Sequence, residues 1–479
     1  MLTIANLTLT HRKDLTVLVD SLSFTLNDGE RLALIGEEGN GKSTLLRVLA
    51  SDPSVESYIE VSGSFSCRDS AAYQPQELPE SERTLSAYDF FCMSPVFFDQ
   101  SPRELGELAA RLSLPADVFY SDQLMQTFSG GERVKLQLAR LLMSNPTTLL
   151  LDEPTNDLDS DSVLWLENFL LSCKLTVLFV SHDEALLSRV ATSILLLERL
   201  RRRQVPRATL YRMGYDRFYE ERGATFEKQT RIARKEREDF NAKMERYDAI
   251  RRKVERDQNA ISRQDPHGSR LLKKKMHTVQ AMGRRFEREQ ENMTAMPEQE
   301  EAIFAKLDCA PLPADKTVLD LSCAELSVGG RTLCRNIRLT VRANEKLCIC
   351  GHNGVGKSTL LHLIRDTLKK RDDLRVFYMP QDAGDLLDFS LSPVELLSPS
   401  GEKEERSRAG ILLGSMKFTA DEMNHPSAGL SGGQKAKLMF LMMAQSGANV
   451  LLLDEPSRNL SPLSGPVIRE LLAEYPGCI

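Results

Sequence analysis

The feature that most constrains this chain is a series of short motifs that occurs twice in the same order. Each copy begins with a glycine-rich stretch ending in Gly-Lys-Ser-Thr, at residues 36–44 and 351–359. A Tyr-X-Pro-Gln segment, a Ser-Gly-Gly segment and an apolar run ending in Asp-Glu then follow in both copies. Equivalent lysines lie 315 residues apart, the glutamines 305, and the serines and aspartates 302. Two collinear series of this length exclude coincidence and predict two domains of one fold.

The glycine-rich stretches predict phosphate-binding loops. A strand, expected at 31–35 and around Cys348-Ile-Cys350, leads into each loop, and a helix begins near its lysine. Glycine lets backbone N–H groups turn around phosphate oxygens, and the helix directs its positive end at them. The lysine would reach the β- and γ-phosphates and the following serine would bind Mg²⁺. The predicted residues are Gly36, Gly39, Gly41, Lys42, Ser43 and Thr44, and Gly351, Gly354, Gly356, Lys357, Ser358 and Thr359.

The buried runs that end in Asp-Glu predict the metal site and the catalytic bases. Residues 148–153 and 450–455 resemble parallel strands, which are apolar throughout. Asp152 and Asp454 would hold Mg²⁺, and Glu153 and Glu455 would polarise the attacking water. His182, after a strand expected at 176–180, would contact the γ-phosphate.

Two further motifs complete each series. Gln76 and Gln381 follow strand-like stretches and are expected at the metal. A Ser-Gly-Gly segment opens a helix, expected at 133–143 in the first copy, and such a bare helix N-terminus attracts an anion. Its residues are Ser129, Gly130 and Gly131, and in the second copy Ser431, Gly432 and Gly433. Alone, each would indicate only a turn or a helix cap, so its assignment depends on its place in the series.

Between the two series, residues 217–289 predict two long helices folded back on each other. Phe240, Met244, Tyr247 and Val254 follow a coiled-coil spacing, and Pro266 and Gly268 stop the helix between the limbs. Each limb of about 40 residues would reach roughly 60 Å. This segment holds 21 Lys and Arg against 13 Asp and Glu, whereas the whole chain has a net charge of −6. The cations are densest near the turn, which favours binding to RNA over mere solvation of a coiled coil.

With these motifs, the chain resembles the ABC-type ATPases and in particular the ABC-F family, whose members have two cassettes and no transmembrane domain. The resemblance implies an α/β fold with two P-loop ABC ATPase cassettes joined by a long α-helical coiled-coil hairpin. The expected domains are 1–216, 217–305 and 306–479. It also implies ATP and Mg²⁺ as cofactors and hydrolysis of ATP to ADP and phosphate. The two cassettes would pair head to tail within one monomeric chain, each P-loop facing the other cassette's Ser-Gly-Gly segment.

The family resemblance further implies a ribosomal partner. The hairpin would reach from the tRNA exit site toward the peptidyl-transferase centre and contact rRNA and tRNA. The resemblance allows two roles, that of a general translation factor and that of a factor that protects the ribosome from antibiotics. Two other classes compete, namely the energy subunit of a membrane transporter and a DNA-maintenance ATPase. A transporter subunit gives no reason for a basic hairpin, and in the DNA-maintenance class the coil typically interrupts a single cassette.

Several positions depart from the family pattern. Glu38 replaces the usual asparagine of the first P-loop, so its side chain is expected to point away from the phosphates. No aromatic residue is placed to stack on adenine, and His11 and Val328 stand near that position. The spacing from glutamine to signature serine is 53 and 50 residues, which leaves no room for the extra arm of some translation factors. The step from Asp152 to His182, applied to Asp454, lands beyond Ile479, so the second cassette is expected to be incomplete.

Composition also indicates where the protein is located in the cell and whether it crosses a membrane. No apolar run approaches the ~18 residues of a membrane span, and the first residues show no signal peptide. Nine cysteines without framework spacing predict reduced thiols in a cytoplasmic protein. Cys348 and Cys350 are expected to be semi-buried strand residues rather than metal ligands.

Overall fold

The computed structural model describes residues 1–67, 70–199, 205–260, 266–291, 293, 307, 309–313, 315–458 and 460–479. Contacts divide the chain into two compact units, Met1–Asp216 with Glu300–Ile479, and Arg217–Gln299. The first unit contains both cassettes and the second contains the hairpin. The finer division at 216 and 305 stays a prediction.

The first cassette begins with a small antiparallel sheet. Its strands are β1 (Leu2–His11), β2 (Val17–Leu26) and β4 (Ile59–Cys67), in the order β2-β1-β4. Leu2, Ile4, Leu22 and Phe24 are buried on one face of this sheet. The alternation of apolar and polar residues over 1–30 predicted this antiparallel pairing, and the register confirms it.

A six-stranded sheet carries the predicted catalytic motifs of the first cassette. Its order is β5 (Ala71–Gln74), β6 (Thr148–Asp152), β7 (Thr176–Val180), β3 (Arg31–Ile35), β8 (Ser193–Arg199) and β9 (Val205–Tyr211). All neighbours are parallel except β8 and β9. β6 and β7 are buried along their whole length, as the apolar runs predicted. Because parallel strands end at one edge, the loops after β3, β6 and β7 meet there.

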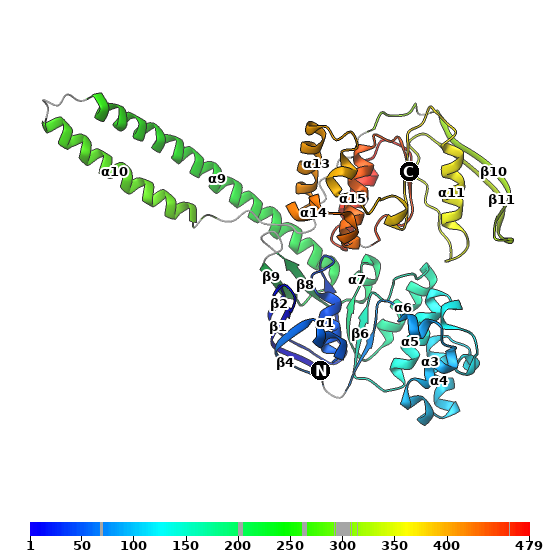
Figure 1. Cartoon of the computed structure of the whole chain (residues 1–479). Helices are drawn as coiled ribbons and strands as arrows, with labels where there is room; N and C mark the ends of the chain where they lie inside the picture. Colours follow the sequence, from blue (N-terminus) through cyan, green and yellow to red (C-terminus); the bar gives the residue numbers. More distant parts are fainter. Residues whose placement is uncertain are drawn as a thin grey trace. The chain divides into compact units, whose positions relative to one another are not determined.

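Helices pack against this sheet, and several of them follow β5 in the chain and form a group of their own (Figure 1). They are α1 (Lys42–Leu49), α2 (Glu80–Arg83), α3 (Ala87–Cys92), α4 (Pro102–Leu112), α5 (Gly130–Leu142), α6 (Ser160–Ser172) and α7 (Glu184–Val190). α5 begins at Gly130, three residues earlier than predicted, because Ser129 already caps the helix and accepts a hydrogen bond from the Glu132 amide.

The second cassette repeats parts of this architecture. Its strands are β10 (Thr317–Val328) and β11 (Arg331–Arg342), which are antiparallel, and β12 (Val376–Met379) and β13 (Val450–Leu453), which are parallel. Its helices are α11 (Lys357–Leu368), α12 (Pro393–Leu397), α13 (Lys403–Ser415), α14 (Ala420–Asn424), α15 (Gly432–Gln445) and α16 (Gly465–Glu474). A core centred on Leu413, Leu438 and Phe440 holds α13 and α15 together.

The strand expected before the second P-loop is not formed, and that prediction was wrong. Residues 345–350 have no regular structure, and Cys348 and Cys350 are exposed rather than semi-buried. In the first cassette β3 is paired on both sides, by β7 and β8. Among the described residues of the second cassette, only Cys478 and Ile479 make backbone pairings equivalent to those of β7 in the first cassette. Cys478 bridges Val450, and the Ile479 amide donates to the Glu345 carbonyl oxygen.

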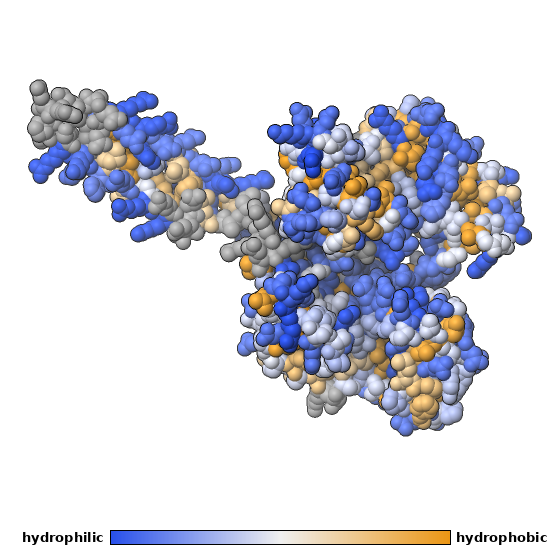
Figure 2. All heavy atoms as spheres, in the orientation of Figure 1, coloured by the Kyte–Doolittle hydropathy of each residue, from blue (hydrophilic) through white to orange (hydrophobic). Residues whose placement is uncertain are grey.

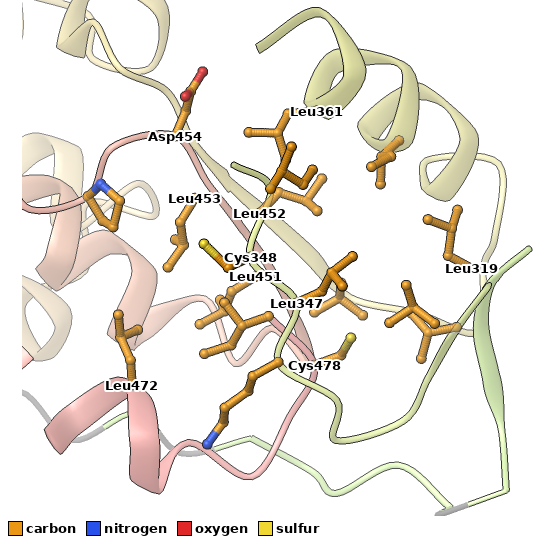
Figure 3. A pocket seen from close by; sticks show the side chains of 18 of the residues that line it. Leu319, Leu347, Cys348, Leu361, Leu451, Leu452, Leu453, Asp454, Leu472 and Cys478 are labelled. Carbon is orange, nitrogen blue, oxygen red and sulfur yellow. The ribbon is translucent and has the colours of Figure 1, made fainter. Parts of the chain in front are cut away.

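An apolar cavity of about 660 Å³ lies beside β13 (Figure 3). It is bounded by β13, α11, α16 and the irregular residues 346–349. Leu347, Leu452 and Leu472 contribute to its lining. The cavity accounts for the 46% exposure of Leu347. All nine cysteines of the chain are free thiols.

The hairpin consists of α9 (Tyr215–Ala260) and α10 (Pro266–Glu291). The rings of Phe240 and Tyr247 lie 6.3 Å and 5.5 Å from that of Phe286, and Lys243 pairs with Glu289. These contacts confirm the predicted antiparallel limbs and their apolar seam. Val254 and Val279 are also buried in the seam.

One detail of the seam was not predicted. A Cβ atom at Gly283 would lie 2.7 Å from the Tyr247 hydroxyl oxygen, so the glycine on α10 makes room for a tyrosine on the other limb. α10 has 26 residues, fewer than the predicted 40, whereas α9 has 46. Hydrophilic residues predominate on the hairpin face seen in Figure 2, with some hydrophobic residues among them.

The predicted cations of the turn fall on both sides of residues 261–265. Arg263, a cation of the turn itself, lies outside the described residues. The described cations at this end of the hairpin have exposed side chains: Arg251, Arg252, Lys253, Arg256, Arg270, Lys273, Lys274 and Lys275. Of these, Arg251 forms an ion pair of 2.9 Å with Glu255 on its own helix.

Candidate active sites

The first P-loop joins β3 to α1 and is largely buried. The Lys42 ammonium donates to the carbonyl oxygens of Gly36 and Glu37, at 2.7 and 2.9 Å. Gly41, which caps α1, has a φ of 85°, a conformation that favours glycine. The Lys42 side chain therefore lies folded along the P-loop, which is also where the phosphate oxygens would bind. Thr44 follows Ser43 in the first turn of α1 and is half-buried.

The predicted metal residues of the first cassette are in contact. The Ser43 hydroxyl donates to Asp152 Oδ1 at 3.0 Å, and the Tyr73 hydroxyl donates to Asp152 Oδ2 at 3.1 Å. Burial raises the pKa of Asp152 above its usual value, while the Ser43 hydrogen bond lowers it. Burial also raises the pKa of Tyr73, so the phenol stays a donor. Tyr73 was missed by the sequence prediction, although an equivalent tyrosine recurs at Tyr378.

The predicted base and histidine of the first cassette also meet. His182 Nε2 lies 3.0 Å from Glu153 Oε1, and the His182 amide donates to Glu153 Oε2 at 3.1 Å. Glu153 has a φ of 47°, and Glu455 has 50°. Glutamate rarely adopts this left-handed backbone, and such strain clusters at functional sites. Its occurrence at both predicted bases shows that the turn after each Asp-Glu strand is built alike.

The two predicted glutamines differ in their contacts. Gln76 is exposed at the end of its turn. Gln381 instead donates from its amide nitrogen to Glu455 Oε2 at 2.8 Å. Arg458 lies 3.7 Å from the same carboxylate oxygen.

The second P-loop repeats the lysine geometry but is more exposed. Lys357 donates to the Gly351 and His352 carbonyl oxygens at 2.8 and 3.0 Å, as Lys42 does in the first loop. The loop glycines Gly354 and Gly356 have positive φ, and Ser358 and Thr359 lie in the first turn of α11. Asp454, at the end of β13, is buried.

The signature segments cap their helices in the same way. Ser129 with Glu132, and Ser431 with Gln434, form reciprocal capping boxes on α5 and α15. A Cβ at Gly130 would lie 2.2 Å from the Asp157 carbonyl oxygen, and one at Gly131 would lie 2.1 Å from the Ser162 hydroxyl. These two glycines are thus also required by packing, Gly130 against the loop after β6 and Gly131 against the first turn of α6. Gly432 and Gly433 begin α15.

The structure brings one predicted pair of motifs from different cassettes into direct contact. The first P-loop meets the second signature segment, where the Gly433 amide donates to Glu38 Oε2. The side chain of Glu38 thus points to the other cassette, and Glu37 beside it pairs with Lys437 of α15.

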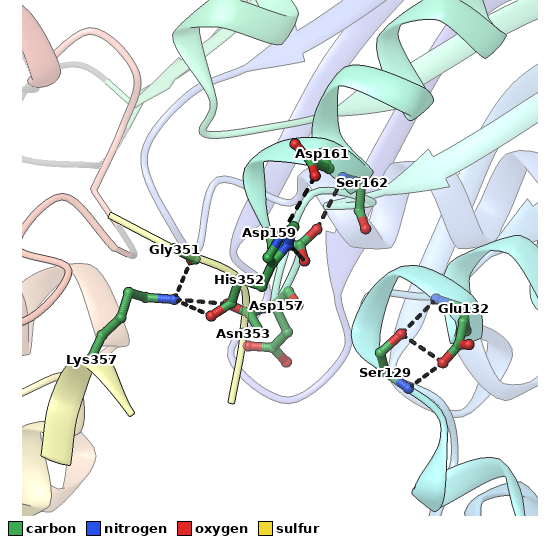
Figure 4. Close-up of polar contacts among 10 residues, drawn as sticks. All are labelled: Ser129, Glu132, Asp157, Asp159, Asp161, Ser162, Gly351, His352, Asn353 and Lys357. Carbon is green, nitrogen blue, oxygen red and sulfur yellow. Dashed lines mark hydrogen bonds and ion pairs between the residues drawn. The ribbon is translucent and has the colours of Figure 1, made fainter. Parts of the chain in front are cut away.

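The second P-loop meets the loop after β6 instead (Figure 4). His352 Nδ1 lies 3.0 Å from Asp159 Oδ2, and the Asn353 side chain donates to the Asp157 carbonyl oxygen at 2.7 Å. Hydrogen bonds from Ser162 hold the pKa of Asp159 at about 2, and His352 adds to this effect. The Asp157 carbonyl oxygen thus lies between Asn353 and Gly130 of the first signature segment.

A cavity of about 1150 Å³ lies beside this second contact. Lys357, Ser358 and Gln381 line it from the second cassette, and His182 and Asp157 line it from the first. The volume is large for a small-molecule pocket. Val328, one of the two residues noted near the expected adenine position, is exposed at its wall.

Comparisons with known proteins find similar sequences over both cassettes. The family model described as ABC transporter matches residues 19–156 and 334–458, more than half of the chain. Among similar proteins, Probable ATP-binding protein YheS of Escherichia coli K12 is 26% identical over 98% of this chain and 74% of its own length. ATP-binding cassette sub-family F member 3 of Rattus norvegicus is 29% identical, over 93% and 64%. ABC transporter F family member 4 of Arabidopsis thaliana is 29% identical, over 96% and 68%.

Within the part of the chain that the structure describes, no helix combines the length and the apolar character needed to cross a bilayer.

Proposed function

We propose that this chain, which belongs to the ABC transporter family and within it to the ABC-F proteins, acts on the ribosome. As a tandem-cassette member of that family it binds and hydrolyses ATP. In the proposed mechanism, ATP draws the two cassettes together, and this closure positions the basic hairpin near rRNA and tRNA. The role is that of a translation factor or of a factor that protects the ribosome from antibiotics.

The residues of the first cassette fit the predicted chemistry. Lys42 would release its two carbonyl contacts and neutralise phosphate oxygens, because a triphosphate offers it stronger, charged acceptors. Ser43 and Asp152 present a hydroxyl and a carboxylate oxygen 3.0 Å apart, and Mg²⁺ prefers such oxygen ligands. When bound there, Mg²⁺ would offset charge on the phosphate oxygens. Tyr73 holds the Asp152 carboxylate in place for that role.

Glu153 would orient and deprotonate the attacking water. Its contact with His182 keeps the carboxylate at the edge of the sheet. The His182 side chain would be the group that donates to a γ-phosphate. Gln76, the signature residues Ser129, Gly130, Gly131, Ser431, Gly432 and Gly433, and the second-cassette residues Lys357, Ser358, Gln381, Asp454 and Glu455 are proposed in their predicted roles.

The charge of the hairpin is the observation that carries the ribosomal proposal. Residues 217–289 have a net charge of +8, while the rest of the chain has −14. Arg270, Lys273, Lys274 and Lys275 are all exposed on α10 near the turn. Cations that contact phosphates release counterions, which gives affinity and a characteristic dependence on salt.

Cosedimentation with ribosomes over a range of salt concentrations tests the proposal. We expect Arg270, Lys273, Lys274 and Lys275 changed together to Gln to weaken binding. The slope of log affinity against log salt should fall by roughly 0.7–0.9 for each phosphate that the hairpin no longer neutralises.

The matched control replaces four exposed cations elsewhere on α9, namely Arg231, Arg234, Lys235 and Arg237. It removes the same charge and should change the slope less. Equal effects of the two sets would show that net charge alone matters, and an unchanged slope in both would contradict the proposal. Binding to membranes or DNA-stimulated ATP hydrolysis would favour the transporter or DNA-maintenance alternatives.

A further inference from the structure

The two P-loops carry different side chains at the two positions after their first glycine. The first loop has Glu37 and Glu38, and the second has His352 and Asn353 at the positions 315 residues later. Each of these four side chains contacts the other cassette. The contacts differ in kind, because the first loop places carboxylates against a helix N-terminus and the second places an amide and an imidazole against an acidic loop.

Glu37 fixes the first loop to the second signature helix. Its carboxylate pairs with the Lys437 ammonium, and both side chains are nearly inaccessible, at 7% and 5% exposure. Lys437 lies on α15, about one turn beyond the signature glycines. The equivalent lysine of the first cassette, Lys135, lies over the Trp165 ring instead, 4.7 Å from its centre. The buried ion pair is therefore specific to the contact of the first P-loop with α15.

Glu38 occupies the N-terminus of that helix. Ser431 and Gln434 satisfy each other's amides, at 2.9 and 3.3 Å. The Gly433 amide is directed outward and donates to Glu38 Oε2. An anion at this place is stabilised by the amide and by the helix dipole. A terminal phosphate held by Lys42 and the second signature segment would need the same amide.

The second P-loop offers no such anion. Asn353 replaces Glu38 and is bonded to the Asp157 carbonyl oxygen, away from any signature amide. His352 replaces Glu37 and lies against Asp159. The carboxylate on a signature helix is thus a property of the first site and not of P-loops in this chain generally.

We infer that Glu38 is a tethered competitor of the terminal phosphate of ATP at the site formed by Lys42 and Gly433. ATP enters that site fully only when Glu38 leaves the Gly433 amide. The Glu37–Lys437 pair keeps the loop beside the helix, so that Glu38 returns when the phosphate is released. This inference rests on the proposed assignment of Lys42 and Gly433 to one ATP site.

Equilibrium binding of fluorescent ATP and ADP analogues tests the inference. All variants carry Lys357→Ala, so that binding reports the first site, and circular dichroism confirms that they are folded. We expect Glu38→Asn, which copies the second loop, to bind the ATP analogue about ten-fold more tightly, as for the removal of one competing charge-assisted hydrogen bond. The ADP analogue, which lacks the terminal phosphate, should bind with nearly unchanged affinity.

Two further variants separate occupation of the amide from simple repulsion. Glu38→Asp keeps the charge but shortens the side chain, so it should also gain affinity for the ATP analogue. Glu60→Asn removes an exposed carboxylate from β4 and should change neither affinity. Equal gains for the ATP and ADP analogues, or no gain in Glu38→Asn and Glu38→Asp, would overturn the inference while the ATP site stands. Absence of binding in every variant would overturn both the inference and the assigned site.

Discussion

Replacing Lys437 with Met should loosen the first P-loop from α15. The substitution keeps an apolar stem of similar length but removes the Lys437 ammonium that pairs with the Glu37 carboxylate, which is only 7% exposed. Breaking a buried pair in this way typically costs about 3–5 kcal/mol. The chain can relieve that cost by moving the loop away from α15 into water. The opening equilibrium should then rise by roughly 150-fold to several thousand-fold.

Hydrogen exchange measured by mass spectrometry gives a direct readout. Most residues from Gly36 to Lys42 are buried, so local opening should expose their amides and speed their exchange by a comparable factor. Glu37→Gln should have a similar effect because it leaves the Lys437 ammonium unpaired. The double variant buries neither of these two charges and should exchange within about ten-fold of the parent, which gives a coupling energy of at least about 4–5 kcal/mol.

Lys135→Met is the matched control. Lys135 is the equivalent residue of the first cassette, and its ammonium lies over Trp165 rather than against the P-loop. Exchange over residues 36–42 should not change in this variant. The reasoning is refuted if Lys437→Met alters that exchange less than about three-fold, or if the effects of Lys437→Met and Glu37→Gln simply add in the double variant.

Three other outcomes are expected. Glu153→Gln with Glu455→Gln should lower the ATPase rate by about 10²–10⁴-fold while ATP binding persists, because the amide keeps the size but cannot accept a proton; retained turnover would contradict this. Asp152→Asn should raise the melting temperature at pH 7.5, and this gain should shrink toward pH 4. Folding raises the pKa of Asp152 above 3.8, so between 3.8 and that raised pKa the folded parent binds more protons than the unfolded chain. The parent therefore loses stability as the pH rises through this range; a gain independent of pH would contradict the prediction. Phe286→Ala should speed hydrogen exchange across the hairpin by about 30-fold, as for about 2 kcal/mol of weakened packing; unchanged exchange would show that the seam does not hold the limbs together.

Local patterns in the sequence predicted much of the secondary structure around the candidate sites. The apolar runs at β6 and β7, the glycine-lysine loops and the capping serines depend on neighbours in the sequence, and each lies where its pattern placed it. The seam of the hairpin follows from a spacing along each helix. These features are predictable because the residues that determine them are a few positions apart.

The features that the sequence did not reveal depend on distant partners. Tyr73 meets Asp152 across the parallel pair β5 and β6, and Glu37 meets Lys437 from 400 residues away. No local pattern records such a pairing. The irregular residues 345–350 show the same principle in reverse, since their apolar sequence suits a strand but a strand also needs neighbours to accept its backbone hydrogen bonds.

The repeat has a consequence for building hybrids of the two cassettes. Thr148 is paired with Thr176 in the first cassette, and Val450 is bridged to Cys478, the same two positions shifted by 302 residues. The next amide repeats as well, since Val177 donates to Glu30 and Ile479 donates to Glu345. Segments 129–177 and 431–479 therefore begin at the same helix cap and end in the same strand register. A hybrid that exchanges the two segments therefore needs no inserted or deleted residue at either junction.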